Sequence, residues 1–166
     1  MGKINAKLKV ILDKAQVEQA ETRVFFERIK KKKPRDLDNK IHDLHQKTFK
    51  KIDCLDCANC CSTTSPIFRD VDIKRLSKHL KMKESHFVSA YLKMDEESDF
   101  VLQQSPCAFL GNDNKCAVYE HRPLACREYP HTDRKNMIQI VGITEKNTMI
   151  CPAVSTIIEE LKKGYL

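Results

Sequence analysis

Cysteine spacing constrains this chain more than any other feature, because four of its eight cysteines fall within eight residues. They form the segment Cys54-Leu-Asp-Cys57-Ala-Asn-Cys60-Cys61. Thiolates are soft ligands that select zinc, copper(I) or iron–sulfur clusters over magnesium or calcium. On a helix the four side chains would span about 120°, and in a loop the two-residue spacers would let successive sulfurs surround one centre. The segment therefore predicts a cysteine-ligated metal centre.

The compartment decides whether cysteines form disulfides or bind metal. Residues 1–10 carry three lysines and no long apolar stretch, so we expect neither a signal peptide nor a membrane span. We therefore expect a cytoplasmic protein. In a reducing cytosol disulfides rarely persist, and clustered cysteines usually bind metal or do redox chemistry.

The other four cysteines are more dispersed along the chain. Eight thiolates can make two four-cysteine sites, or one such site with four cysteines beside it. Because Cys60 and Cys61 are adjacent, both can hardly bind one tetrahedral ion without strain. One of them is expected to ligate a second centre or to lie buried as an apolar residue. The candidate metal ligands are Cys54, Cys57, Cys60, Cys61, Cys107, Cys116, Cys126 and Cys151.

Both iron and zinc suit such ligands. Three cysteines on two-residue spacers, with a remote Cys151-Pro152, are similar to bacterial ferredoxin ligation. Structural zinc sites usually take two separated cysteine pairs, and the distal cysteines form no such pair. We therefore prefer an iron–sulfur cluster of the 4Fe–4S type, with zinc as the alternative.

Hydrophobic periodicity predicts mainly helix. One long amphipathic helix is expected from Ile4 to about Lys32, ended by Pro34, and a second from Asp36 or Asp38 onward. Further helices are expected to begin at three later positions, which are Asp70, Glu84 or Ser85, and Pro152.

Segments rich in strand-forming residues are few. Only Phe100–Leu102 and Met137–Val141 qualify, and residues 112–114 predict a hairpin turn between Cys107 and Cys116. The expected fold is α+β and mainly α, with an N-terminal amphipathic helix, a minor β-hairpin and a small irregular centre organised by metal.

Charge divides the chain at about residue 50. Residues 1–50 hold 14 Lys or Arg against 7 Asp or Glu, whereas residues 51–166 hold 16 of each. We therefore predict a basic helical extension over residues 1–50 and a cysteine-cluster domain over residues 51–166. A basic arm can attract nucleic acid. We favour a solvated helix face instead, because Lys30 to Lys33 suit the negative end of the helix dipole.

The residues around the cysteines carry a family resemblance. The distal motifs are Cys107-Ala-Phe-Leu, Cys116-Ala-Val-Tyr-Glu-His-Arg-Pro-Leu-Ala-Cys126-Arg-Glu-Tyr-Pro and Cys151-Pro. With the first cluster they make roughly residues 50 to 155 resemble the YkgJ-like cysteine-cluster family, of the CxxCxxCC type. The resemblance implies zinc or iron chelation far more than it implies a reaction.

A relative of that family, the flagellin lysine N-methylase, has a similar cysteine set tied to an iron–sulfur cluster and to methyl transfer. Only Gly111 and Gly142 lie inside the cysteine-bearing region, which disfavours a glycine-rich nucleotide cradle. We therefore do not assign the methylase activity to this chain, and a cluster-dependent enzyme stays an alternative.

Two arginines flank Cys126 closely in sequence. Four thiolates on Zn²⁺, or around a 4Fe–4S cluster, leave a net negative charge. Arg122 and Arg127 are predicted to offset it and to donate hydrogen bonds to sulfur. The leading hypothesis is a metal-binding protein with a structural or electron-transfer role and an unidentified protein or redox partner. An enzyme and a basic-armed zinc protein that binds nucleic acid stay open.

Overall fold

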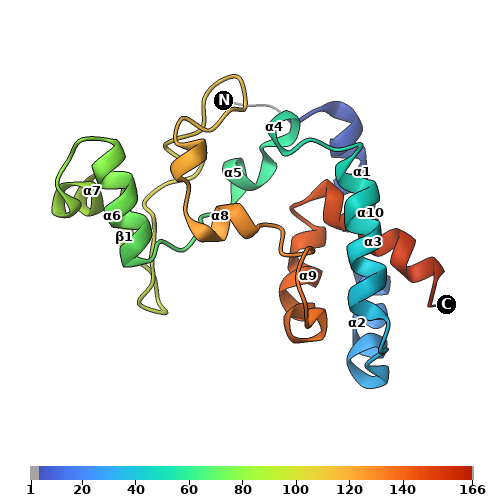
Figure 1. The fold of residues 1–166 in the computed structure, drawn as a ribbon. Coiled ribbons are helices and arrows are strands. Elements are labelled where there is room, and N and C mark those ends of the chain that lie inside the picture. Colours follow the sequence, from blue (N-terminus) through green and yellow to red (C-terminus); the bar gives the residue numbers. More distant parts are fainter. Residues whose placement is uncertain (1–3, 166) are drawn as a thin grey trace. The chain divides into compact units, whose positions relative to one another are not determined.

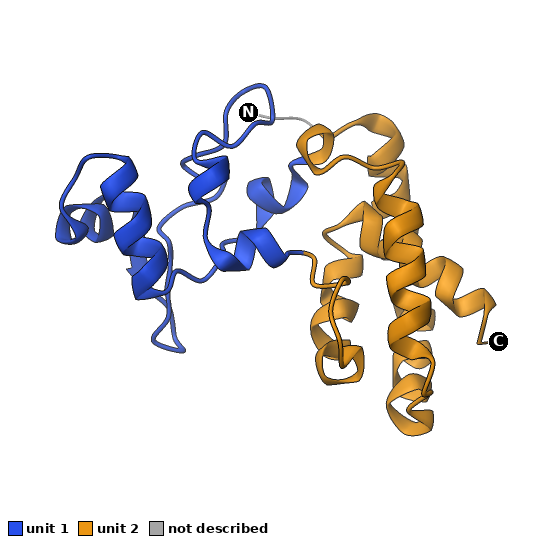
Figure 2. Cartoon of the chain, in the orientation of Figure 1, with its two compact units in different colours: residues 1–3, 58–129 blue, residues 4–57, 130–166 orange. Residues whose placement is uncertain are grey.

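The structure is a computed structural model that describes residues 4–165. Within that range the chain is mainly helical, with one antiparallel sheet of two strands, which confirms the predicted fold class. The described residues form two compact units (Figure 2). Unit 1 comprises residues 58–129, and unit 2 comprises residues 4–57 together with 130–165. The predicted division at residue 50 stays a prediction.

Unit 2 is a helical assembly around its last helix (Figure 1). Helix α10 contacts α1, α3 and α9, and α2 packs against α9. Proline is tolerated in a first helical turn, where α10 has Pro152. The elements of unit 2 are α1 (Ala6–Val17), α2 (Gln19–Lys32), α3 (Leu37–Phe49), α4 (Cys54–Cys57), the 3-10 helix η2 (Met137–Ile140), α9 (Val141–Thr148) and α10 (Pro152–Lys163).

The core of unit 2 lies on the apolar face of α10. Val154, Ile157, Ile158 and Leu161 are at most 2% exposed and follow the three- and four-residue steps of one helix face. This face matches the periodicity that predicted the helix. On α2, the buried residues include Phe25, Phe26 and Ile29.

Two sequence predictions in unit 2 are wrong. The single helix expected from Ile4 to Lys32 is broken at Glu18, where φ is −91° and ψ is 12°. The two halves pack against different helices, α1 on α10 and α2 on α9, and Glu18 interrupts the apolar stripe. The strand expected at residues 137–141 is instead η2 and the start of α9. The start of η2 is fixed by Asp38, which accepts hydrogen bonds from the backbone N–H groups of Asn136 at 2.6 Å and Met137 at 2.9 Å.

Unit 1 packs two helices and a small sheet around aromatic residues. Strands β1 and β2 pair antiparallel, with Leu92 opposite Leu102 and Met94 opposite Phe100. The elements of unit 1 are α5 (Asn59–Thr63), α6 (Asp70–His79), α7 (Glu84–Tyr91), β1 (Leu92–Met94), β2 (Phe100–Leu102), the 3-10 helix η1 (Tyr119–His121) and α8 (Leu124–Glu128). The predicted helices at Asp70 and Glu84 and the strand at Phe100 are confirmed.

The core of unit 1 supports two cysteines. Cys107 and Cys116 are partly buried against the cluster formed by Phe68, Ile73, Leu76, Phe87, Leu92, Leu102, Phe109 and Val118. Between the two cysteines lies the predicted hairpin turn, in which Leu110 and Cys116 form an antiparallel bridge. The Gly111 N–H donates to the Lys115 carbonyl oxygen at 2.8 Å. A Cβ at Gly111 would approach Asp113 Oδ1 to 2.7 Å, so a larger residue there would require the Asp113 side chain to shift.

Helix length bears on membrane association. Among residues 4–165, every helix is too short or too polar to span a lipid bilayer.

Candidate metal centre

The eight cysteines divide between the two units. None of the eight forms a disulfide in the described part of the chain. Unit 1 contains the five residues Cys60, Cys61, Cys107, Cys116 and Cys126, which we call the unit 1 thiols. Unit 2 contains Cys54, Cys57 and Cys151, which we call the unit 2 thiols. The dense cluster in the sequence is therefore shared between the two units.

Cys61 is the common neighbour of the unit 1 thiols. Its own pKa is lowered to about 7, because the Cys60 thiol donates a hydrogen bond to its sulfur. The Cys107 N–H donates to the Cys61 carbonyl oxygen at 2.8 Å, which brings the segment at residue 107 to α5. Cys61 thus combines a sulfur that ionises easily with a backbone tie to a distal cysteine.

The three distal unit 1 thiols lie close enough to Cys61 for its charge to affect them. Burial raises the pKa of Cys107 to about 11 and that of Cys126 to about 12, and it also raises the pKa of Cys116. In each case negative charge on Cys61 raises the pKa further. Four thiolates that repel one another are expected to take a cation together, because the cation replaces repulsion with attraction.

Arg122 is a cationic neighbour of this group. Its charge lowers the pKa of Cys116 and of Cys126, which partly opposes the effect of burial. Its guanidinium lies 3.7 Å from the Tyr119 ring centroid and donates to the Tyr119 carbonyl oxygen at 2.6 Å. Arg127 is exposed on α8. The predicted role of both arginines beside a metal stays a prediction.

The unit 2 thiols influence one another electrostatically near the start of α10. Cys151 is the residue before Pro152, and burial raises its pKa to about 12. Hydrogen bonds from the backbone N–H groups of Val154 and Ala153 lower this pKa, whereas negative charge on Cys54 and Cys57 raises it. The backbone donors favour a thiolate at this helix N-terminus. Cys57 is buried and Cys54 is exposed.

Sequence reasoning missed a buried carboxylate in unit 1. Asp72 on α6 is inaccessible to solvent, yet it accepts hydrogen bonds from Arg75 Nη2 at 2.6 Å and Arg69 Nε at 3.0 Å. The Leu124 N–H also donates to Asp72 Oδ1, at 3.3 Å. The available signal was an aspartate on the apolar face of α6, beside Ile73, with arginines three residues before and after it.

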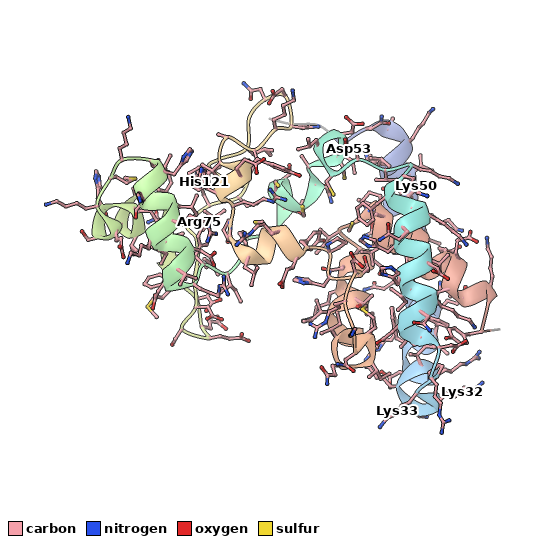
Figure 3. The ribbon with its side chains drawn as sticks, viewed as in Figure 1. Lys32, Lys33, Lys50, Asp53, Arg75 and His121 are labelled. Atoms are coloured by element: carbon pink, nitrogen blue, oxygen red, sulfur yellow. The ribbon has the colours of Figure 1, made fainter. Side chains whose placement is uncertain are left out.

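Arg75 extends this network to the segment before Cys126. Its Nε donates to the His121 carbonyl oxygen at 3.2 Å, and its Nη2 donates to the Arg122 carbonyl oxygen at 2.9 Å. Figure 3 shows Arg75 on α6 beside His121. We call Asp72, Arg75 and the backbone groups they bind the α6 clamp.

Asp72 is expected to make the free energy of unfolding sensitive to acid. Burial alone would raise its pKa, but hydrogen bonds from Arg69 and Arg75 lower it to about 2. Because the pKa is lower in the folded state, the stabilisation is present above about pH 4 and is lost as the pH falls toward 2. It amounts to about 2 kcal/mol. Asp36 and Glu159 also have lowered pKa values, so both proteins lose stability in acid. Urea unfolding at pH 5, 3 and 2 is expected to show a larger loss in the natural protein than in Asp72→Asn.

Histidine side chains make contacts within each unit. In unit 2, His42 Nδ1 lies 2.7 Å from Asp133 Oδ1, and His45 Nδ1 lies 2.8 Å from Thr132 Oγ1. These contacts join α3 to the segment before η2. In unit 1, the His121 ring stacks on His79, with 4.0 Å between centroids.

The cysteine sulfurs of each unit are near enough to affect one another's charge, but they do not surround a common metal position. Within residues 4–165, no group of three or more His, Cys, Asp or Glu side chains is arranged to hold a metal ion. The donor chemistry nevertheless fits a soft cation, because each unit gathers thiols that affect one another's ionisation. Metal binding would require the thiols to lose their protons and their side chains to converge.

Comparison with known families identifies the same residues. A family model of the CxxCxxCC type, described as "Putative zinc- or iron-chelating domain", matches residues 53–152. This stretch covers more than half of the chain and contains all eight cysteines. Neither the curated proteins nor the solved structures contain a match to the chain.

Proposed function

This chain belongs to the CxxCxxCC family, and on that premise we propose that it binds zinc or iron through cysteine thiolates in each of its two units. The observation that carries the proposal is the family match, whose residues 53–152 include all eight cysteines. Within each unit the thiols also lie within electrostatic range of one another. Cys126 is affected by Cys61, Cys107 and Cys116, and Cys151 is affected by Cys54 and Cys57. Such thiols become a soft-metal donor set once they lose their protons and converge.

In unit 1 the proposed ligands are Cys61, Cys107, Cys116 and Cys126. Four thiolates complete a tetrahedral ion or a four-cysteine cluster. Cys60, which hydrogen-bonds to Cys61, would favour the thiolate form of that ligand. Arg122 would offset part of the negative charge that four thiolates bring.

In unit 2 the proposed ligands are Cys54, Cys57 and Cys151. The first two are separated by two residues, and the third precedes a proline, as in bacterial ferredoxin ligation. Three thiolates leave one coordination position that the cysteines of this unit do not fill. The role of such a centre would depend on what occupies that position.

We prefer an iron–sulfur cluster of the 4Fe–4S type to zinc. Only one CxxC pair, Cys54 and Cys57, falls within either group, whereas structural zinc sites usually take two such pairs. An iron–sulfur cluster, when bound, supplies one-electron chemistry, whereas zinc has no redox chemistry. The proposed role is accordingly electron transfer or structural support.

Proton release tests the ligand chemistry. Burial holds Cys107, Cys126 and Cys151 protonated at pH 7, so each must release a proton when it binds metal. Adding Zn²⁺ to metal-free protein in weakly buffered solution at pH 7 is expected to release several protons per ion. An indicator dye measures the release, and the affinity should rise steeply with pH. Zn²⁺ uptake without proton release would contradict thiolate ligation.

A second candidate function rests on the turn between α2 and α3. We call the four exposed residues Lys31, Lys32, Lys33 and Arg35 the basic tip. In the described part of the chain no carboxylate lies within ion-pair distance of them, whereas the nearby Lys30 pairs with Glu27. Figure 3 shows Lys32 and Lys33 at the end of this hairpin. Such a cluster suits the phosphates of nucleic acid.

Neutralising the basic tip should weaken nucleic-acid binding. A variant with all four residues changed to Gln is expected to lower affinity for duplex DNA and to reduce the salt slope by up to about four charges. Fluorescence anisotropy at two salt concentrations measures both. The matched control changes Lys78, Lys81, Lys83 and Lys93 of unit 1 to Gln, removing the same charge. Equal losses in both variants would attribute binding to net charge and exclude the basic tip as the binding surface.

A further inference from the structure

We propose that Asp72 and Arg75 are positioning residues that place Cys126 for metal binding. The proposal rests on the proposed function, in which Cys126 is a ligand of unit 1. Its own basis is the α6 clamp, in which a helix without any cysteine holds the backbone just before Cys126.

The clamp binds backbone groups of three residues within the segment 121–124. Arg75 binds the carbonyl oxygens of His121 and Arg122, and Asp72 accepts from the Leu124 N–H. Leu124 is the first residue of α8, the short helix that carries Cys126. A five-residue helix has little stability of its own, so its position must come from tertiary contacts.

Arg75 is chemically suited to this task. Its planar guanidinium presents several N–H donors in a fixed geometry, which allows it to bind Asp72 and two backbone carbonyls at once. A lysine can keep the ion pair with Asp72, but its single ammonium group cannot reproduce that geometry. Arg75 also neutralises the Asp72 charge, which would otherwise be very costly in a site with no solvent access.

The other unit 1 ligands are positioned by different contacts. Cys107 and Cys116 lie against the aromatic core, and Cys107 is tied to Cys61 through the backbone. The clamp would therefore give Cys126 a polar support in addition to the apolar packing that places Cys107 and Cys116. Loosening it should affect Cys126 more than the other thiols.

Arg75→Lys and Arg69→Lys form a matched pair of variants. Both arginines bind Asp72, but the side-chain hydrogen bonds of Arg69 all go to Asp72, whereas Arg75 also binds the carbonyl oxygens of residues 121 and 122. Lysine at position 69 keeps the positive charge that Arg69 presents to Glu128. The first measurement is alkylation of metal-free protein by N-ethylmaleimide, with each cysteine followed by peptide mass spectrometry. Arg75→Lys is expected to speed alkylation of Cys126 about tenfold, through easier local opening, and to leave Cys151 unchanged.

The second measurement is Co²⁺ titration. Arg75→Lys is expected to weaken cobalt binding by about 10- to 100-fold at one of the two centres, as substitutions beside a ligand typically do. The thiolate-to-cobalt absorbance at saturation should lose the share of one thiolate, a spectroscopic change that a purely structural role would not produce. Arg69→Lys should change neither quantity. Asp72→Asn, checked for folding by circular dichroism, should match Arg75→Lys.

The two measurements separate the clamp from the proposed function. If Arg75→Lys behaves like Arg69→Lys in alkylation and cobalt binding, the clamp proposal is overturned while metal binding stands. If the natural protein takes up neither cobalt nor, on anaerobic reconstitution, an iron–sulfur cluster, but Cys126 still alkylates faster in Arg75→Lys, the clamp positions Cys126 and the proposed function fails. Should Arg75→Lys lose its fold, the double variant Arg75→Gln with Asp72→Asn, which removes the clamp without leaving an unpaired buried charge, replaces it in the same two assays.

Discussion

Replacing Cys61 with Ser is expected to remove one metal centre and to leave the other intact. Negative charge on Cys61 affects Cys107, Cys116 and Cys126, so its loss removes the ligand that all three distal thiols share. We expect the affinity of this centre to fall by more than about a hundredfold, beyond the usual effect of substitutions that only neighbour a ligand. Metal analysis and native mass spectrometry measure the number of ions or clusters per chain.

Cys57→Ser is the matched control, because it makes the same chemical change four residues away in the other unit. It is expected to remove the unit 2 centre and keep the unit 1 centre. Each variant should also be less stable than the natural protein, because the binding energy of a ligand set is coupled to folding. If either single substitution empties both centres, the eight cysteines form one ligand set and the two-centre proposal is wrong.

The sequence predicted the local structure well where the pattern and the packing agree. The apolar face of α10 follows helical periodicity from Val154 to Leu161, and all of that face is buried. Pro34 follows the end of α2, at which Lys33 has a φ of 43°. The turn near Gly111 was visible in its residue types.

The failures occur where a tertiary contact overrides a local preference. Residues 137–140 are rich in strand formers, but Asp38 binds the N–H groups of Asn136 and Met137, and this contact joins residues nearly a hundred positions apart. The break at Glu18 likewise depends on which helices α1 and α2 contact. Neither contact is encoded in the local pattern.

The sequence indicated which cysteines are candidate ligands, but not how they are grouped in the two units. Spacing identified all eight cysteines as candidates, and the adjacency of Cys60 and Cys61 predicted that one centre could not use both equally. The association of Cys151 with Cys54 and Cys57 depends on the packing of α10 within unit 2, which periodicity does not specify. Asp72 was overlooked because charged residues on helices are usually solvated, and only its burial shows its role.

The identity of the metal gives the largest expected effect of all. Protein purified without oxygen is expected to be brown, to contain iron and acid-labile sulfide, and to bleach in air. Loss of the cluster should also lower the melting temperature by about 10 °C or more, because several kcal/mol of binding energy would no longer stabilise the folded chain. Iron, sulfide and zinc are measured on the same sample, and the melting temperature is measured before and after bleaching.

The physical reason for expecting iron lies in how the ligands are distributed. The distal unit 1 cysteines are separated by eight and nine intervening residues, so they lack the paired spacing that structural zinc sites use. Cells supplied with both metals provide the control, because each metal is then available during folding. Colourless protein with stoichiometric zinc and no sulfide would overturn the iron assignment, and cysteine ligation would still stand because zinc accepts the same thiolates.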